Sequence, residues 1–214
     1  MKKFRFAILG AGHIARQFCD AVSRIDGCEV CAVASKSLAR AENFAKENGV
    51  ESYYDDYETL LEKERADCAY IAVTTNDHYR LSVLCVNHSV PVLCEKAMFQ
   101  NSEEAKNLYA LASEKKIFVM EALWSRYLPA VQQAKRWVEQ EKIGKPTVLQ
   151  CNIGFLAPDE KENRYFNPKL GGGAAKDITV YAYEITTFIL NQAIKNISVS
   201  ATWSDTGVDV TDHV

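Results

Sequence analysis

The sequence contains no long apolar run and no leader-like start. A helix that crosses a bilayer needs roughly 18 or more consecutive apolar residues, and no such stretch occurs in this chain of 214 residues. The first apolar segment, Phe4–Leu9, is short, is interrupted by Arg5 and is followed at once by glycines, unlike the core of a secretory signal peptide. We therefore expect a cytoplasmic protein that does not enter a membrane.

Positive charge is not in surplus. The 25 Lys and Arg residues against 28 Asp and Glu residues give a formal net charge of -3, and the two signs are interleaved along the chain. Binding of nucleic acid or of an acidic membrane surface usually requires a basic patch, so neither partner is expected. Hydrophobic residues make up 48% of the chain, which is enough to bury a substantial core.

The cysteines form no disulfide framework. There are seven, an odd and scattered set: Cys19, Cys28, Cys31, Cys68, Cys85, Cys94 and Cys151. Such a set favours reduced thiols. Cys28 and Cys31 have the C-x-x-C spacing, but they lie in a predicted strand, and no second cysteine pair completes a zinc site. We expect neither metal binding nor redox use.

Short apolar runs alternate with helical patterns over residues 1–122. The predicted strands are Phe4–Leu9, Glu29–Ala34, Cys68–Val73, Val90–Cys94 and Ile117–Ala122. The predicted helices are one that carries Ile14, Phe18 and Val22, one from Ser37 to Gly49, Tyr57–Lys63, His78–Asn87, and one that begins at Asn101. Strands that alternate with helices of this length form βαβ units and a parallel sheet. The fold class is therefore predicted to be α/β, with an N-terminal Rossmann doubly wound parallel sheet.

The pattern changes after residue 122. The predicted elements are a helix from Pro129 to about Ile143, a strand at Pro146–Phe155, a polar loop at Ala157–Leu170, a helix from Gly171–Gly173 to about Leu190, and a strand at Ile197–Trp203. Two strands and one helix between them are too few for an independently stable domain. We expect residues 123–214 to be the start of an α+β domain that is truncated here or completed by further chain.

A glycine-rich turn separates the first strand from the first helix. Residues Gly10-Ala11-Gly12-His13-Ile14-Ala15 match G-x-G-x-x-A in that context. Gly10 permits the tight turn, Gly12 lets the backbone approach a pyrophosphate, and Ala15 allows close packing of helix and strand. The helix start at His13 and Ile14 presents free N–H groups to the anion. The segment predicts a nicotinamide-dinucleotide site.

The end of the second strand indicates which coenzyme is preferred. NAD-selective domains usually place an acid there to bind the ribose 2′-hydroxyl. Here Ser35 and Lys36 occupy the position, Arg40 follows one turn later, and no acid occurs before Glu42. Ser35 and Lys36 suit a 2′-phosphate, so NADP(H) is favoured and NAD(H) stays possible. The alternative is that Lys36 is an ordinary exposed loop residue.

A second polar pair follows the strand at Val90–Cys94. Glu95 and Lys96 lie at its carboxyl end, the edge at which open α/β sheets bind ligands. A lysine with restricted solvent beside an oxidised nicotinamide suits proton transfer or the binding of a substrate hydroxyl. The alternative is a surface ion pair between the two residues.

The second half contains a third candidate group. The run Gly171–Gly173 precedes Asp177 and Tyr181, which are four residues apart and would share one face of an α-helix. A triple glycine lets the start of that helix approach another surface closely. A carboxylate and a phenol mounted on this helix could face Lys96 across a cleft. The alternative is a packed tyrosine and a solvated acid.

Taken together and in order, these motifs resemble one oxidoreductase family. Gly10–Ala15, Cys94–Lys96 and Gly171–Gly173 with Asp177 are similar to segments of the Gfo/Idh/MocA oxidoreductases. Met120–Arg126, Tyr181 and Thr206–Asp209 resemble the dihydrodiol and xylose dehydrogenase branch of that family. The resemblance covers essentially the whole chain. It implies a Rossmann domain, residues 1–122, and an open-faced sheet domain, from residue 123, that supports a homodimer or higher homo-oligomer.

The resemblance also implies roles for single residues. Lys96 corresponds to the lysine of the family's E-K-P motif, Asp177 to its helix acid, and Tyr181 to the proton donor and acceptor of the dihydrodiol branch. Trp124 and Arg126 are implied on the substrate side, although Trp124 would also suit the core between domains.

Further coenzyme contacts are implied at the ends of two strands. Thr74 stands in a segment where the family commonly has T-P-N, and His78 keeps its place 17 residues before Glu95. Ala97 replaces the proline of the E-K-P motif. Thr74, His78, Glu95 and Lys96 are therefore implied as coenzyme contacts, with the local backbone at residue 97 differing from the family pattern.

The sequence thus predicts an NADP(H)-dependent oxidoreductase. Its implied reaction transfers a hydride between nicotinamide and a secondary alcohol or carbonyl of a sugar, polyol or cyclic dihydrodiol, a small-molecule substrate. A non-catalytic protein that senses dinucleotides on the same fold is the alternative, because a fold does not fix a function.

Overall fold

The computed structural model describes residues 2–158, 160 and 163–214, and the chain divides into two compact units, Met1–Ala122 and Leu123–Val214. No helix formed by the described residues could span a bilayer. Each unit is considered by itself below.

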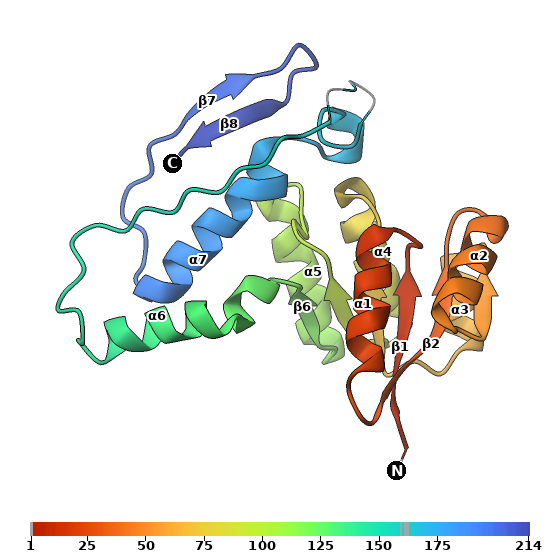
Figure 1. Cartoon of the computed structure of the whole chain (residues 1–214). Coiled ribbons are helices and arrows are strands. Elements are labelled where there is room, and N and C mark those ends of the chain that lie inside the picture. Colours follow the sequence, from red (N-terminus) through yellow and green to blue (C-terminus); the bar gives the residue numbers. More distant parts are fainter. Residues whose placement is uncertain (1, 159, 161–162) are drawn as a thin grey trace. The chain divides into compact units, whose positions relative to one another are not determined.

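The first unit is built on a six-stranded parallel sheet in the order β3-β2-β1-β4-β5-β6 (Figure 1). Its strands are β1 (Phe4–Leu9), β2 (Cys28–Ala34), β3 (Ser52–Tyr54), β4 (Cys68–Ile71), β5 (Val92–Cys94) and β6 (Val119–Glu121). The chain runs from the middle of the sheet to one edge and then returns to the other side of β1. The strand order therefore reverses between β1 and β4, the point at which such sheets bind ligands. The predicted doubly wound α/β fold is confirmed.

Five helices connect the strands. They are α1 (His13–Ser23), α2 (Leu38–Asn48), α3 (Tyr57–Lys63), α4 (Thr75–Asn87) and α5 (Ser102–Lys115). Side chains of Ser37, Asp56 and Asn101 accept backbone N–H groups at the starts of α2, α3 and α5, which satisfies donors that every helix start leaves unpaired. Gly49 ends α2 with a left-handed φ of 66°.

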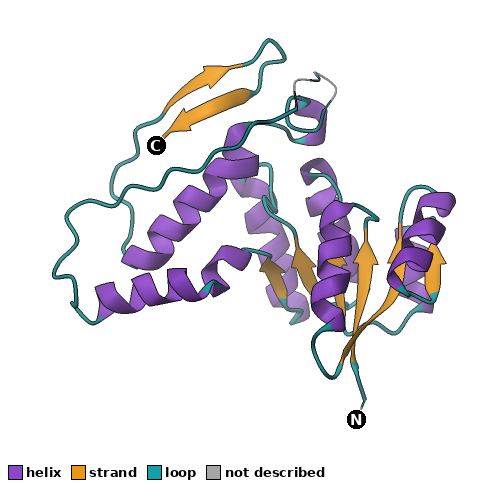
Figure 2. Ribbon diagram, viewed as in Figure 1, coloured by secondary structure: helices purple, strands orange, loops and turns teal. Residues whose placement is uncertain are grey.

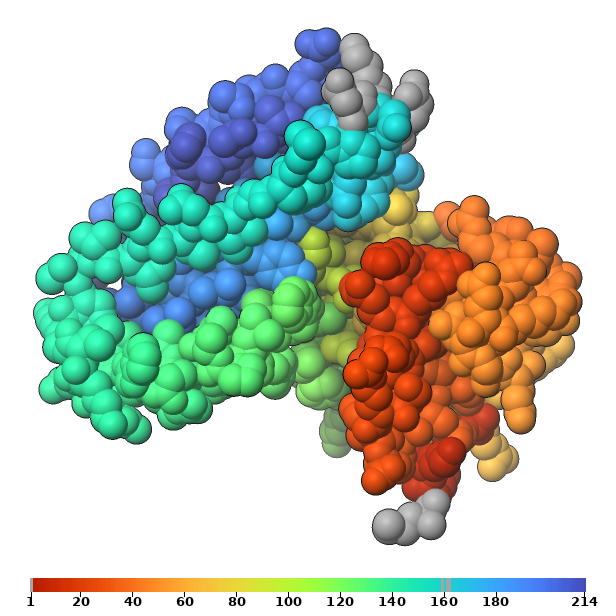
Figure 3. Space-filling model, viewed as in Figure 1, coloured from red at the N-terminus to blue at the C-terminus, as the bar shows by residue number. Residues whose placement is uncertain are grey.

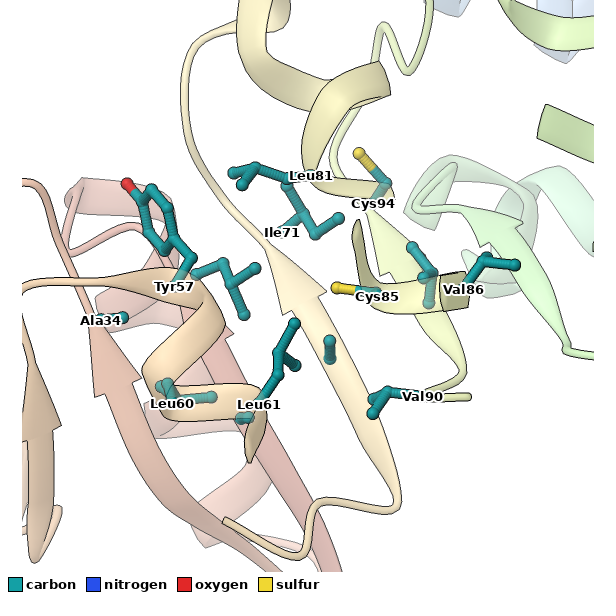
Figure 4. Packing of buried hydrophobic residues seen from close by; sticks show 14 of the residues in the cluster. Ala34, Tyr57, Leu60, Leu61, Ile71, Leu81, Cys85, Val86, Val90 and Cys94 are labelled. Carbon is teal, nitrogen blue, oxygen red and sulfur yellow. The ribbon is translucent and has the colours of Figure 1, made fainter. Parts of the chain in front are cut away.

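The sheet buries apolar side chains on both faces. Leu9 and Ile71 belong to a cluster with α3, α4 and α5, whereas Ile8 belongs to a second cluster with α1 and α2. Figure 4 shows the first cluster, in which Leu61 and Leu81 from two helices pack over the strand that carries Ile71. Burial on both faces explains why these strands occur in the sequence as continuous apolar runs instead of alternating ones.

Helices α1 and α2 lie side by side on the other face of the sheet, as the red and orange surfaces of Figure 3 show. Arg16 of α1 places Nη2 3.0 Å from Glu47 Oε2 of α2, and its guanidinium carbon lies 5.8 Å from the centre of the Phe44 ring. An exposed ion pair of this kind contributes little alone. The buried Ala15 and Phe44 side chains belong to the apolar cluster that packs α1 and α2 on this face of the sheet.

The second unit has fewer regular elements (Figure 2). They are the 3₁₀ turn η1 (Trp124–Tyr127), α6 (Pro129–Glu139), the 3₁₀ turn η2 (Pro168–Leu170), the π-helical turn η3 (Ala175–Thr179), α7 (Val180–Leu190), β7 (Ser200–Trp203) and β8 (Asp209–His213). Strands β7 and β8 pair antiparallel. The mixture agrees with the predicted α+β character of this part.

Several predicted boundaries in the second unit were wrong. Pro146–Phe155 forms no strand, although its residues alternate in polarity, because its backbone takes no part in a described sheet and alternation specifies a strand only where a partner strand exists. The helix at Pro129 ends at Glu139 and not at Ile143. The strand β8 was not predicted at all, because polar residues such as Thr211 and Asp212 obscure its pattern.

The seven cysteines are free, and most are buried. Burial raises the pKa of Cys19 and of Cys68 to about 11 and that of Cys85 to about 12. Cys28 lies at the start of β2 and is only half-buried. Among the described residues, no three His, Cys, Asp or Glu side chains gather as metal ligands would.

We expect iodoacetamide to label Cys28 in the folded protein well before Cys19, Cys68, Cys85 and Cys94. The thiolate is the reactive form, and burial both blocks access and disfavours that charge. Timed labelling followed by peptide mass spectrometry measures the rates, with protein unfolded in urea as the control in which the rates converge. Equal rates in the folded protein would contradict the packing described here.

Candidate active site

The turn after β1 can hold only glycine at its first position. Gly10 has φ of 113°, and a Cβ on it would lie 2.5 Å from the Ala72 carbonyl oxygen and 2.9 Å from Val73 Cγ1. The Gly10 N–H donates to the Ala34 carbonyl at 2.8 Å. The turn at Gly10 is therefore tight, as the glycine motif predicted, and it packs against the residues that follow β4.

The start of α1 offers main-chain donors to a ligand. Gly12 caps the helix without a side-chain hydrogen bond, and a Cβ on it would meet only the Ala72 oxygen, at 3.8 Å. Ala15 is fully buried, whereas His13 and Ile14 are exposed. Amides at a helix start attract anions. The arrangement fits the pyrophosphate of a dinucleotide.

The residues after β2 differ in exposure. The Ser35 side chain is buried, and its backbone N–H donates to the Tyr54 carbonyl at 3.1 Å. Lys36 is exposed, and its Nζ lies 2.5 Å from Asp77 Oδ2 of α4. Arg40 is exposed on the first turn of α2. The sequence-based analysis did not anticipate the contact with Asp77.

The segment that follows β4 is fixed by His78. Its Nδ1 lies 2.8 Å from the Ala97 carbonyl and its Nε2 lies 3.1 Å from the Val73 carbonyl. Burial lowers the pKa of His78. Thr74 caps α4, and its hydroxyl donates to Asn76 Oδ1 at 2.6 Å. His78 therefore joins the end of β4 to the residues that follow β5.

Glu95 and Lys96 follow β5 directly, as predicted. Glu95 Oε1 accepts a hydrogen bond from the Tyr70 hydroxyl at 2.6 Å, and its Oε2 accepts the Lys96 N–H at 3.3 Å. The Tyr70 ring stacks on Phe18 of α1, with ring centres 3.8 Å apart. The half-buried Lys96 is joined to Ala97 by a cis peptide bond. Glu95 thus connects the lysine backbone to the aromatic pair beneath α1.

In the second unit, the Tyr181 hydroxyl accepts a hydrogen bond from Trp124. The donor Nε1 lies 2.8 Å from the phenolic oxygen, and the two rings meet edge to face at 75°. Trp124 is 56% exposed, so its indole is not core. An N–H aimed at this oxygen stabilises negative charge there.

Asp177 is not on a regular α-helix with Tyr181. It lies in the π turn η3, whereas Tyr181 lies in α7, so the spacing of four does not give the predicted common face of an α-helix. Asp177 Oδ1 lies 3.0 Å from Arg164 Nη1. The π turn was not predictable from the spacing of apolar residues.

The triple glycine brings the start of this helix against two other segments, as predicted. A Cβ on Gly172 would lie 2.7 Å from the carbonyl oxygens of Arg164 and Tyr165, and one on Gly173 would overlap the Asp209 carboxylate. The same carboxylate accepts the Ala175 N–H. A pocket of about 270 Å³ in this unit is lined by Asp177 together with aromatic and acidic side chains, among them Phe155, Tyr165 and Asp212.

Glu184 was not predicted from the sequence as a candidate functional residue. It is buried one turn after Tyr181, accepts a hydrogen bond from the Ser125 hydroxyl, and places Oε2 2.8 Å from Arg126 Nε. Arg126 also lies over the Phe188 ring at 5.5 Å. The sequence of α7, VYAYEITTFIL, has a single carboxylate among mostly apolar residues, and this pattern could have indicated a buried and paired acid. Glu184 fixes the turn that carries Trp124.

Both units match sequence models of known domains. Residues 4–123 match "Oxidoreductase family, NAD-binding Rossmann fold", and residues 131–214 match "GFO/IDH/MocA C-terminal domain". The chain belongs to the Gfo/Idh/MocA oxidoreductase family. The predicted family resemblance is thereby confirmed.

Relatives and solved structures agree with this family. Proteins named trans-1,2-dihydrobenzene-1,2-diol dehydrogenase are similar to the chain, at 33% identity in Mus musculus over 98% of the chain and at 31% in Danio rerio over 96%. The chain spans 63% and 62% of the length of these two relatives.

Two solved structures have the same fold. An NAD-binding protein from Listeria innocua has 25% identity and a TM-score of 0.79, over 95% of this chain and 59% of that one. An oxidoreductase from Agrobacterium radiobacter, solved with NAD+, L-tartaric acid and magnesium, has 20% identity and a TM-score of 0.82, over 99% of this chain and 62% of that one. Both matches extend over residues of the two units. The second, at its lower identity, supports the fold alone.

Replacement of Gly10 by alanine should destabilise the first unit more than the same change at Gly49. Both glycines have positive φ, but nothing lies within 4 Å of a Cβ on Gly49. Gly49→Ala should cost about 1 kcal/mol from backbone strain alone, and Gly10→Ala roughly 1–3 kcal/mol more from the overlap with Ala72. Urea unfolding measures both, and equal losses would disprove the close approach.

Removal of the Glu184 carboxylate should loosen η1. Glu184→Ala leaves the buried Ser125 hydroxyl and the part-exposed Arg126 guanidinium without this acceptor, and should lower the free energy of unfolding by about 1–3 kcal/mol. Glu139→Ala removes an acid that is 47% exposed and lies 3.1 Å from Lys135, and should change the free energy of unfolding by less than about 1 kcal/mol. Thermal unfolding followed by tryptophan fluorescence distinguishes them, and a neutral Glu184→Ala would refute the role assigned to Glu184.

Proposed function

We propose that this chain carries the coenzyme-binding and catalytic residues of an NADP(H)-dependent oxidoreductase. Its substrate is a small molecule with a secondary alcohol or carbonyl, on a sugar, polyol or cyclic dihydrodiol. The observation that carries the proposal is the turn at Gly10, which packs on Ala72 and is followed at once by the start of α1, where no side chain at the N-cap Gly12 accepts the first helix amides. The relatives named dihydrobenzenediol dehydrogenases support the substrate class.

The coenzyme would be held by main-chain groups and by the residues that follow β2. Gly10, Gly12 and the amides of His13 and Ile14 would bind the pyrophosphate. Lys36, with Arg40 one turn further on, carries the positive charge that favours a 2′-phosphate, and no acid follows β2 directly. When bound, a nicotinamide dinucleotide supplies a two-electron hydride acceptor or donor.

The protein's own contribution to the reaction is proton transfer and orientation. Tyr181 Oη would take the proton of the substrate hydroxyl during oxidation and return it during reduction. The Trp124 N–H, 2.8 Å away, stabilises the resulting charge on that oxygen. The Lys96 ammonium would favour the same charged form. Asp177, paired with Arg164, would orient the substrate or the lysine.

We also propose a cytoplasmic homodimer or higher homo-oligomer formed through the second unit. Its hairpin exposes apolar side chains, among them Trp203 at 68% and Val210 at 41%. Apolar groups of this size on a sheet are typical of an interface.

Replacement of the proton-transfer residues should slow turnover without loss of coenzyme. We expect Tyr181→Phe and Lys96→Met to lower the single-turnover rate by about 10²–10⁴-fold, with NADPH binding retained in a fluorescence titration. Tyr183→Phe is the matched control, because Tyr183 lies two residues further along α7 and is 51% exposed. Rates like those of the wild type in both variants would remove these roles, and coenzyme binding without turnover in the wild type would favour a dinucleotide sensor.

A further inference from the structure

An acidic side chain contacts the lysine that follows β2. Asp77, in the first turn of α4, places Oδ2 2.5 Å from Lys36 Nζ and Oδ1 3.2 Å from Arg80 Nε. The Asp77 side chain is only 15% exposed, whereas those of Lys36 and Arg80 are 69% and 56% exposed. One largely buried carboxylate is therefore shared by two cations that reach into solvent.

The carboxylate of Asp77 is charged at neutral pH. Burial opposes ionisation, but hydrogen bonds from Lys36 and Arg80 outweigh it and hold the pKa of Asp77 below its usual value. Two further titratable groups interact with Asp77: Tyr57, at the start of α3, whose pKa is raised by burial, and His78 of α4, whose pKa is lowered by burial. The cluster of Lys36, Asp77, Arg80 and Tyr57 thus contains one negative and two positive charges.

The ion pair between Lys36 and Asp77 joins the two sides of the glycine turn. Lys36 follows β2, Asp77 follows β4, and β1 lies between these two strands in the sheet. Because the strands are parallel, all three connections leave the same edge of the sheet, the edge at which dinucleotides bind. The partners are 41 residues apart in sequence. An inspection of the residues that directly follow β2, where coenzyme selectivity is usually inferred, therefore does not find the acid.

We propose that Asp77 is a specificity-determining residue for the coenzyme. Its carboxylate offsets the attraction of Lys36 for a 2′-phosphate and accepts a hydrogen bond from an unphosphorylated 2′-hydroxyl. The preference for NADP(H) that Lys36 and Arg40 confer is therefore reduced, and NAD(H) is also accepted. This inference rests on the proposed function, because it requires that the turn at Gly10 binds a dinucleotide. It replaces the acid that NAD-selective domains carry at the end of the second strand with one supplied by α4.

The test is isothermal titration calorimetry of the full chain with NADP+ and with NAD+. Asp77→Asn removes the negative charge and keeps the side-chain shape. We expect it to raise the affinity for NADP+ relative to NAD+ by roughly tenfold, the effect of one charge at close range in a partly solvated site. Lys36→Met should shift the same ratio in the opposite direction. Asp77→Ser provides a second variant should Asp77→Asn not fold.

Asp20→Asn is the matched control. It breaks the exposed contact of Asp20 with Arg24, at 2.8 Å, on α1, and should leave the ratio of the two affinities unchanged. A ratio that does not move in the Asp77 variants, or that moves toward NAD+, overturns the inference while coenzyme binding itself supports the proposed function. A wild-type chain that binds neither coenzyme overturns both.

Discussion

The contact between Gly10 and the Ala72 carbonyl sets the geometry of the first unit. With no Cβ in the way, the end of β1 turns directly against the end of β4, and α1 starts at once after Gly12. Ala15 is fully buried in the same apolar cluster as Ile8 and Val33 of the sheet. The connections that carry Lys36, Asp77 and Lys96 leave the same edge, because every strand of this sheet runs parallel to β1. The close approach at Gly10 places the glycine turn at this same edge.

The second unit depends on a different kind of interaction. Glu184 is buried in a helix that is otherwise apolar, and it is stabilised there by Ser125 and Arg126. These hydrogen bonds hold η1 against α7. Trp124 of η1 then donates its indole N–H to the Tyr181 hydroxyl of α7. A buried carboxylate costs free energy unless it is paired, so its retention in this position indicates specificity of arrangement more than stability.

Much of the first unit could be predicted from the sequence because its signals are local. Strands buried on both faces produce apolar runs, and the caps Ser37, Asn101 and Gly49 mark helix ends by their own chemistry. The short strand β3 was missed, because three residues with Ser52 among them carry too little pattern. The failures are contacts between distant residues: Asp77 with Lys36, Glu184 with Ser125, and the pairing of β8. The spacing of residues along the sequence does not predict these contacts, because each depends on how distant segments pack in the folded chain.

A series of side-chain contacts in the first unit links α1 to the residues that follow β5. Phe18 of α1 stacks on Tyr70, the Tyr70 hydroxyl binds Glu95, and Glu95 accepts the backbone N–H of Lys96. The helix that receives the dinucleotide and the strand end that presents the amine are therefore mechanically connected through two rings and a carboxylate. A substitution in α1 that displaces Phe18 would therefore be expected to shift Lys96 as well. Coenzyme affinity at α1 and the position of the Lys96 amine are thus coupled.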